Sequence, residues 1–554
     1  MGSSKLVFSM LYSFLCQLAF SSSSSHFCPK DQSLALLQFK HMFTINPNAS
    51  DYCYNSRTLS WNKSTDCCTW NEVHCEETTR QVIELDLYCN RLQGKFHSNS
   101  SLFHLSNLKL LVLSFNNFSC THVRIGHLCL YPVHAGPSHG SLISPKFGEL
   151  SSLTHLDLSV SGFTGPIPAE ISHLSKLYIL RIWTPDPYGL RLKPYNFELL
   201  LKNLTQLREL EFNSLRGVLA ERVFHLSNLE YLHLPYNSLT GPIPSNVSGL
   251  QNLQSLYLSS NYLNGTIPSW IFSLPSLMHL DLSNNSSSGK IQEFKFNNTL
   301  VLQDLQVLIL SQNNFIGQIA STVCNLKTLF LLDLGSNHLN GTIPQCLGEM
   351  SGLQIIKLHG NKLQGKVPPS LINCKYLELK NFQAMKIIGE NSGTREYIAV
   401  DYSGYYANSL IVTTKGWDRE FFYVLKTKII INFSRNRFEG YLPSITGDLV
   451  GLRTLNLSHN GLEGIIAASL QHLSVLESLD LSSNKIGGEI PQQLVSLTSL
   501  AVLNFLTIIL LDAFLKKSNL ICLRTVHTKG MMVYVDCHSQ KIVVAIMGYR
   551  KRQL

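Results

Sequence analysis

Leucine and asparagine recur along this chain at a fixed spacing, with one unit every 24 residues. A block that begins at Leu329 (LFLLDLGSNHLNGTIPQCLGEMSG) is followed at Leu353 by LQIIKLHGNKLQGKVPPSLINCKY, which has the same length and the same order of apolar and polar positions. The period runs from residue 82 to about residue 504. A period of this size is typical of a solenoid, and the Leu/Asn spacing indicates leucine-rich repeats. We therefore predict a right-handed α/β leucine-rich-repeat solenoid of short parallel strands.

Within one repeat, most of the regular positions have a structural role. Leu329, Leu332 and Leu334 have the spacing that directs them into the core from a short strand. Asn337 follows where its side-chain amide can satisfy backbone groups at the turn, so the repeats should share a continuous asparagine ladder. Gly341 permits the next bend of the chain. We do not expect any of these residues to bind a ligand.

The residues between the leucines should project from the strands onto the concave face of the solenoid, where packing does not dictate their identity. In several repeats they are aromatic, charged or histidine, a composition that suits contacts with another protein. The alternative is an ordinary solvated face. The residues that we predict to bind a ligand are Glu230, Tyr231, His233, Tyr236, Gln254, Tyr257, Met278, His279, Asp281, Phe330, Asp333, Lys357 and His359.

The N-terminus has the features of an exported protein. Lys5 precedes an apolar run that ends at Phe20, and serines follow it, so residues 1–25 are predicted to be a signal peptide. Residues 26–81 contain several closely spaced cysteines, and in an exported chain this pattern predicts a disulfide-stapled cap over the first repeat. We expect the pairs Cys28–Cys67 and Cys68–Cys75, although spacing alone leaves the connectivity open. The alternative, a zinc site, has only His74 beside Cys75 as support.

Glycosylation sequons are numerous, and their density also fits an extracellular chain. Some of them arise from the repeat itself, as in NLS and NGT. The predicted acceptors are Asn48, Asn62, Asn99, Asn117, Asn203, Asn246, Asn264, Asn284, Asn285, Asn297, Asn340, Asn432 and Asn456.

The period is interrupted once and stops once. Repeats at 82–380 give way to a segment at 381–427 that lacks the ladder, and they resume at 428–504. A long insertion inside a compact array is usually functional, and the alternative is a passive insertion. Residues 505–554 carry eight Lys or Arg against two Asp and contain no apolar run long enough for a membrane span. We interpret this atypical basic tail as the product of a frameshift or a retained intron.

The net charge of +9 gathers in that tail, so no basic stripe follows the repeats and nucleic-acid binding is not expected. We find no P-loop, HExxH, GxSxG or kinase motif, and we therefore expect no enzymatic activity, cofactor or metal.

Particular segments resemble a known family. CPKDQSLALLQFK with WNKSTDCCTWNEVHC is similar to the cap of plant leucine-rich-repeat receptor-like proteins. NLTQLREL, GDLVGLRTLNLSHN and LESLDLSSNKIGGEIPQQL resemble the tomato Cf-type proteins that give resistance to leaf-mould fungus. The resemblance covers about residues 1–504.

The resemblance implies a plasma-membrane glycoprotein with an extracellular solenoid, an island and no kinase. Such a receptor binds a pathogen effector protein outside the cell and signals through receptor-like kinase co-receptors in plant defence. The island would be 381–427, the repeats from Lys428 onward would contact a co-receptor, and the island or co-receptor residues would include Tyr402, Tyr405, Tyr406, Lys415 and Glu420. Membrane association is thus a family expectation without a span in this sequence. The alternatives are a secreted inhibitor of fungal wall-degrading enzymes and a truncated, non-functional product.

Overall fold

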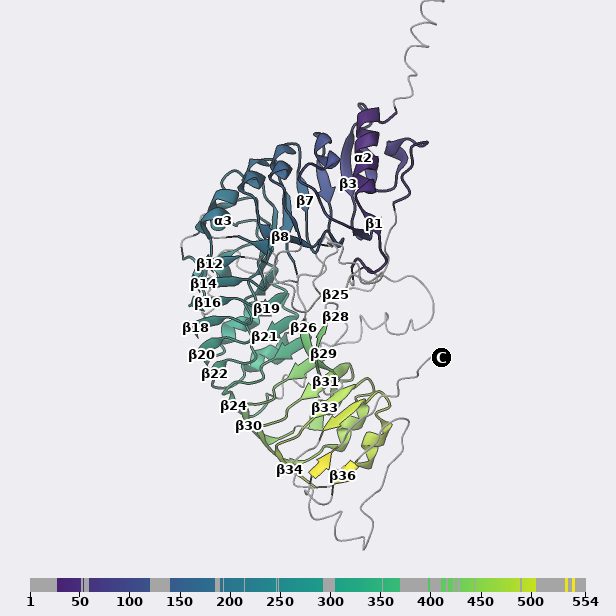
Figure 1. The fold of residues 1–554 in the computed structure, drawn as a ribbon. Coiled ribbons are helices and arrows are strands. Elements are labelled where there is room, and N and C mark those ends of the chain that lie inside the picture. The colour runs from purple at the N-terminus through teal and green to yellow at the C-terminus, as the bar shows by residue number, and fades with distance from the viewer. Residues whose placement is uncertain are drawn as a thin grey trace, which may run out of the picture. The chain divides into compact units, whose positions relative to one another are not determined.

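The computed structural model divides the chain into two compact units, residues 1–214 and residues 215–554. The structure describes residues 27–50, 53, 59–119, 140–184, 190–192, 194–213, 215–245, 247, 249–291, 304–350, 352–368, 397–398, 410–414, 417–421, 424–425, 429–442, 444–488, 491–504, 534–536 and 541–543. Each unit is built of stacked repeats, as the period predicts (Figure 1).

The first unit begins with a helix and continues as a sheet. Helix α2 (Lys30–His41) buries Ala35, Leu36 and Phe39 against the first repeats. The main sheet has the order β2 (Val73–Cys75), β3 (Val82–Asp86), β5 (Leu110–Val112), β7 (His155–Asp157), β9 (Ile179–Ile182) and β11 (Glu209–Phe212). Strand β2 pairs with β3 antiparallel, while β3, β5, β7, β9 and β11 are parallel. A second helix, α3, spans Pro194–Leu200.

The second unit has a longer parallel sheet. Its order is β13 (Tyr231–His233), β15 (Ser255–Tyr257), β17 (His279–Asp281), β19 (Val307–Ile309), β21 (Leu331–Asp333), β23 (Ile355–Lys357), β29 (Ile429–Asn432), β31 (Leu452–Asn456), β33 (Ser478–Asp480) and β35 (Val502–Asn504). Leu329, Leu332 and Leu334 are buried, as are their counterparts in the neighbouring repeats. Because side chains alternate along a strand, the residues between these leucines lie on the opposite, concave face of the sheet.

Strands β23 and β29 are direct neighbours although a long segment separates them in sequence. Ile355 pairs with Ile430 in the ladder, and the backbone N–H of Leu363 donates to Oδ1 of Asn436 across the same junction. The solenoid therefore continues across the break in the period. From the intervening residues the structure describes strand β25 (Tyr397–Ile398), which pairs with β28 (Val424–Leu425), and a hairpin of β26 (Leu410–Thr414) and β27 (Trp417–Phe421).

The regular repeats also form a second strand, and several of them form a 3₁₀ turn within the described residues; the sequence analysis predicted neither. The second strands of the second unit stack in order along one side of it (Figure 1). Gly241 and Gly265 have φ of +79° and +76° in these strands, a conformation that only glycine adopts without strain. The strands are β12 (Arg216–Val218), β14 (Ser238–Pro242), β16 (Tyr262–Gly265), β18 (Ser286–Lys290), β20 (Asn314–Gln318) and β22 (His338–Asn340), followed in a separate sheet by β24 (Gln364–Gly365), β30 (Arg437–Tyr441), β32 (Gly461–Ile465) and β34 (Lys485–Gly487).

The asparagine ladder is present. In a typical repeat, Nδ2 of Asn337 donates to the carbonyls of Leu310, Leu334 and Gly335, and its Oδ1 accepts from the N–H of Phe315. One asparagine thus satisfies backbone groups in its own repeat and in the preceding one, which ties neighbouring repeats together. In the first unit, Ser161 stands at a ladder position and its hydroxyl lies within hydrogen-bonding distance of three carbonyls, those of Leu113, Leu158 and Ser159.

Candidate ligand-binding surface

Four of the predicted ligand-binding residues form one continuous row on the concave face of β13, β15 and β17. The rings of His233 and Tyr257 are 4.6 Å apart and edge to face, and the rings of Tyr257 and His279 are stacked at 6.4 Å. Tyr231 lies beside His233, with ring centroids 6.2 Å apart. His233 and Tyr257 are directly opposite in the strand register, whereas Tyr257 and His279 are diagonal neighbours, which aromatic side chains also reach. We call Tyr231, His233, Tyr257 and His279 the aromatic row.

Hydrogen bonds hold the half-buried members of the aromatic row in place. The hydroxyl of Tyr231 donates to Oε1 of Gln254 at 2.9 Å. Oγ of Ser255 is 3.1 Å from Nδ1 of His279. His233 and Tyr257 are buried. An aromatic surface that is already fixed loses little conformational entropy when a protein ligand binds.

Asp281 lies at the end of β17, next to the aromatic row, and its carboxylate is buried. Burial raises its pKa from 3.8 to about 6, while hydrogen bonds from Ser283 lower it. Oδ1 of Asp281 accepts from both the N–H and the hydroxyl of Ser283. The charge of this group therefore changes over a mildly acidic pH range.

An apolar cluster follows the aromatic row, and the sequence analysis did not select it as a site. Val307, Leu331, Ile355 and Ile430 occupy the same concave position on four successive strands and are buried, with Ile309 and Phe330 packed against them. The signal in the sequence is an aliphatic residue at this position in consecutive repeats, where a solvated face would have polar residues. Of the cluster and its neighbours, only Phe330 is among the residues predicted to bind a ligand.

A polar group lies beyond the apolar cluster on β21 and β23. Nζ of Lys357 donates to Oδ2 of Asp333 at 3.0 Å, and both side chains are almost completely buried. His359 is half-buried and lies two residues after Lys357. Lys357 and Asp333 are therefore in direct contact, and the His359 ring lies against Gly335, two residues after Asp333.

The other predicted residues lie at the margins of the concave face. Tyr236 is 59% exposed and occupies the turn after β13 with φ of +54°, so it is not part of the strand row. Glu230, Gln254 and Met278 precede their strands and are half-buried.

The first unit has a concave ion network that the sequence analysis missed. Arg181 on β9 forms a bidentate pair with Glu209 on β11, and its guanidinium is 3.9 Å from Asp157 on β7. All three side chains are buried. Burial raises the pKa of Asp157, and the charge of Arg181 opposes this shift. The available signal was the row of charged residues Asp157, Arg181 and Glu211 at the same position of neighbouring repeats, with Glu209 two residues before Glu211.

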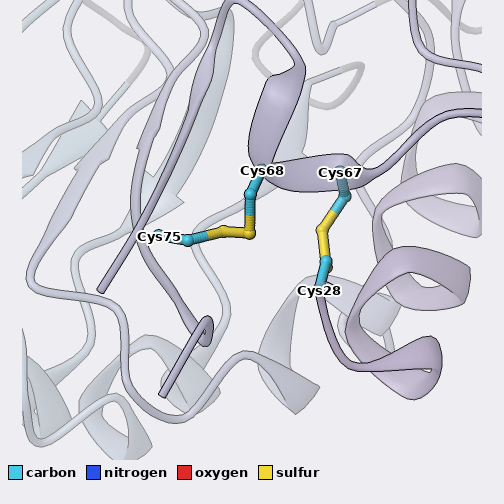
Figure 2. A group of neighbouring side chains, drawn as sticks. All are labelled: Cys28, Cys67, Cys68 and Cys75. Carbon is cyan, nitrogen blue, oxygen red and sulfur yellow. A yellow bond between two sulfur atoms is a disulfide. The ribbon is translucent and has the colours of Figure 1, made fainter. Parts of the chain in front are cut away.

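The cap contains the two disulfides that the sequence analysis expected, Cys28–Cys67 and Cys68–Cys75. Figure 2 shows these bonds side by side, and the four sulfurs lie within 4.8 Å of one another. Sulfurs at this spacing could hold a metal ion as thiolates, but cysteines oxidised in pairs supply no thiolate. The pairs Cys53–Cys89 and Cys324–Cys346 were not expected. Cys324 and Cys346 lie on the 3₁₀ turns of successive repeats, Ser321–Asn325 and Gln345–Glu349.

The structure separates the predicted glycosylation sites by accessibility. Asn285 belongs to the ladder, where Nδ2 donates to three carbonyls, and a glycan on that nitrogen would break these bonds. Asn117, Asn432 and Asn456 are buried and also fit a glycan poorly. Asn246 and Asn297 lie outside the described residues. The exposed candidates are Asn48, Asn62, Asn99, Asn203, Asn264, Asn284 and Asn340.

Most of the predicted island residues cannot be placed. Tyr402, Tyr405, Tyr406 and Lys415 lie outside the described residues, as does the predicted signal peptide, and Glu420 is on β27. From the tail the structure describes only the paired strands β36 (Tyr534–Asp536) and β37 (Lys541–Val543). Within the described ranges, none of the helices has the length and apolar character needed to cross a membrane.

Family models match several parts of the chain. The N-terminal domain of leucine-rich-repeat proteins matches residues 29–76. Leucine-rich-repeat models match residues 152–174, 202–263, 227–286, 429–486 and 450–505.

Curated plant proteins and a solved receptor structure are similar to this chain. Receptor-like protein Cf-9 of Solanum pimpinellifolium is 56% identical over 264 residues, which are 42% of this chain and 28% of that protein. Receptor-like protein 6 of Arabidopsis thaliana is 33% identical over 208 residues, covering 35% of this chain and 19% of that protein. The chain thus matches 28% of the length of the first of these relatives and 19% of the second. The crystal structure of a TDR receptor superposes with a TM-score of 0.54 and 26% identity, over 77% of this chain and 64% of that one. In its repeats and its cap, this chain is thus similar to plant leucine-rich-repeat receptor-like proteins of the Cf type.

Proposed function

We propose that this chain is the recognition part of a cell-surface immune receptor that binds a secreted pathogen protein on its concave face. The observation that carries the proposal is the aromatic row, in which fixed aromatic and histidine side chains of three neighbouring strands form one surface. Binding energy at protein interfaces is concentrated in such residues. The similarity to Cf-9 supports the role in defence.

The remaining parts of the proposal follow from the same relatives. The chain would act at the extracellular side of the plasma membrane, without catalysis, and would signal through receptor-like kinases. The island at 381–427 and the repeats from 428 to 504 would meet the co-receptor, the repeats at 82–380 would meet the ligand, and residues 26–81 would close the N-terminal end.

A binding experiment tests the recognition role. The full chain would be expressed in leaves with an epitope tag, captured on a sensor, and exposed to purified secreted proteins of a leaf-pathogenic fungus. Tyr231→Ala should weaken binding by about tenfold or more, since the aromatic row would lose an anchor.

Tyr262→Ala is the matched control, because Tyr262 is 63% exposed on β16 in the second sheet, away from the concave face. It should bind as the wild type does. Equal affinity of Tyr231→Ala and the wild type would refute the use of the aromatic row. A wild-type chain that binds none of the proteins would refute the recognition role.

A further inference from the structure

Four of the ten concave strands of the second unit, β17, β29, β31 and β33, end in the same way. An Asp or Asn closes the strand, a Ser follows two residues later, and the carboxylate or amide oxygen accepts from both the N–H and the hydroxyl of that Ser. Asp281 with Ser283, Asn432 with Ser434, Asn456 with Ser458 and Asp480 with Ser482 follow this pattern. The serine fixes the acceptor side chain against its own strand.

The repeat of β21 departs from this pattern at one residue, Gly335. The N–H of Gly335 still donates to Oδ1 of Asp333, at 3.0 Å, but there is no hydroxyl to donate a second bond. Oδ2 of Asp333 instead accepts from Nζ of Lys357 on the next strand. In this repeat, therefore, glycine stands in place of the serine, and the Asp333 carboxylate pairs with a side chain on the next strand.

The space that a serine would occupy at 335 is filled by His359. A Cβ atom placed on Gly335 would lie 2.2 Å from Cε1 and 2.4 Å from Nδ1 of the His359 ring, and such an overlap is impossible. His359 is at the equivalent position of the following repeat, where Ser434, Ser458 and Ser482 stand in later ones. The chain thus has a small residue and a large residue side by side where two serines would be regular.

Gly335 and His359 in place of two serines give the ends of β21 and β23 hydrogen-bonding groups that differ from those of the neighbouring repeats. Lys357 stands on β23, and among the equivalent positions of the described repeats in this unit, from His233 on β13 to Asn504 on β35, no other residue is a lysine or arginine. The imidazole of half-buried His359 can donate a hydrogen bond to a carboxylate, and the Lys357 ammonium, buried against Asp333, supplies positive charge nearby.

We infer that Gly335 is a positioning residue that seats the His359 imidazole over β21, and that His359 with the Lys357–Asp333 pair forms a subsite for a carboxylate side chain of the protein ligand. The subsite rests on the proposed recognition role. The positioning of His359 rests on geometry alone, so the two parts are tested separately.

The positioning is tested without a ligand in the full-length chain. Diethyl pyrocarbonate acylates exposed imidazoles, and mass spectrometry resolves the rate at His359. Gly335→Ser should raise that rate by about threefold or more, because a close-packed site cannot hold both groups and the ring must leave. It should also lower the thermal midpoint, and the double variant with His359→Ser should restore it. An unchanged rate, or a double variant as unstable as Gly335→Ser alone, would overturn the positioning.

The subsite is tested with the secreted fungal protein that the wild-type chain binds in the panel described above. Gly335→Ser and His359→Ser should each weaken binding by about tenfold. Ser482→Gly makes the opposite exchange at the same position of a repeat outside the predicted ligand-binding residues, and it should leave binding unchanged. Wild-type affinity in both His359→Ser and Gly335→Ser would overturn the subsite while the recognition role stands. A wild-type chain that binds nothing would overturn the recognition role and, with it, the subsite.

Discussion

Two adjacent asparagines, Asn313 and Asn314, show how much the position within a repeat matters. Asn313 is a buried ladder residue whose Nδ2 donates to the carbonyls of Leu282, Leu310 and Ser311 and whose Oδ1 accepts from the N–H of Ser287. Asn314 is exposed on β20. Asn313→Ala should lower the free energy of unfolding by about 2 kcal/mol or more, because each buried unsatisfied polar group costs about 1–3 kcal/mol. Asn314→Ala should change it by less than about 0.5 kcal/mol. Urea denaturation of both variants measures the difference, and similar losses would contradict the ladder role.

The pKa of Asp281 predicts a stability that depends on pH. Because burial raises this pKa from 3.8 to about 6, the folded chain binds a proton at Asp281 more readily than the unfolded chain does. The contribution of Asp281 to the free energy of unfolding is therefore largest below pH 3.8 and is lost as the pH rises through about 6. Relative to Asp281→Asn, the wild type should lose about 2–3 kcal/mol between pH 4 and pH 7. Urea denaturation at several pH values measures this difference, and parallel pH profiles for the two chains would contradict it.

At the residue scale, the sequence predicts the roles of residues that recur in every repeat. It does not predict roles that depend on a side chain of a neighbouring repeat. Leu332 and Asn337 are recognisable because their roles recur every repeat. The role of Gly335 is visible only beside His359, since the overlap involves two strands that are 24 residues apart. The candidate surface shows the same division. The positions of Tyr257 and His279 on one face follow from strand alternation, whereas the burial of Asp281 and the apolar cluster depend on the packing of several repeats.

At the element scale, the first strand of each repeat is predictable and the second is not. The first strand, such as Leu331–Asp333, has the leucine alternation of a half-buried strand. The second, such as His338–Asn340, is short and contains few apolar residues. It forms because glycines bend the chain until equivalent segments of neighbouring repeats lie side by side, and a single repeat in isolation gives no sign of this pairing.

The disulfide Cys324–Cys346 joins the 3₁₀ turns of two neighbouring repeats and has a sequence separation of 22. The double variant Cys324→Ser/Cys346→Ser should lower the free energy of unfolding by about 3 kcal/mol, because the unfolded chain would no longer be restricted by a closed loop of this length. Chemical denaturation under non-reducing conditions measures the loss. A double variant as stable as the wild type would show that the repeats do not need this cross-link.

At the scale of the whole molecule, the continuity of the second unit across its insertion was the least predictable feature. The sequence shows that the period stops after residue 380 and resumes at 428, but this pattern fits two separate arrays as well as one. The structure distinguishes them, because β23 pairs with β29 and the ladder bond from Leu363 reaches Asn436. Pairing between segments this far apart in sequence cannot be read from local periodicity.

Continuity of the solenoid predicts that residues 377–427 can be removed without unfolding the repeats. This deletion joins Tyr376 to Lys428 and restores the 24-residue period, so that Ile355 and Ile430 stay one repeat apart. Stability in a solenoid is approximately a sum of repeat and nearest-neighbour terms, and these terms are kept. The deleted chain should therefore unfold cooperatively, with a thermal midpoint within about 5 °C of the wild type.

A longer deletion that is out of phase, residues 365–427, provides the control, because it leaves Ile355 and Ile430 only 12 residues apart. It cuts the second strand of one repeat after Gln364 and leaves an incomplete coil before Ile429–Asn432, so the chain should lose its cooperative transition. Circular dichroism melting and limited proteolysis compare the two. If the in-phase deletion also abolishes the cooperative transition, the inserted segment is part of what holds the neighbouring repeats together. If the in-phase deletion folds but no longer supports a defence response in leaves, the deleted segment takes part either in ligand recognition or in a later step. Measuring ligand binding to the captured chain distinguishes these two roles.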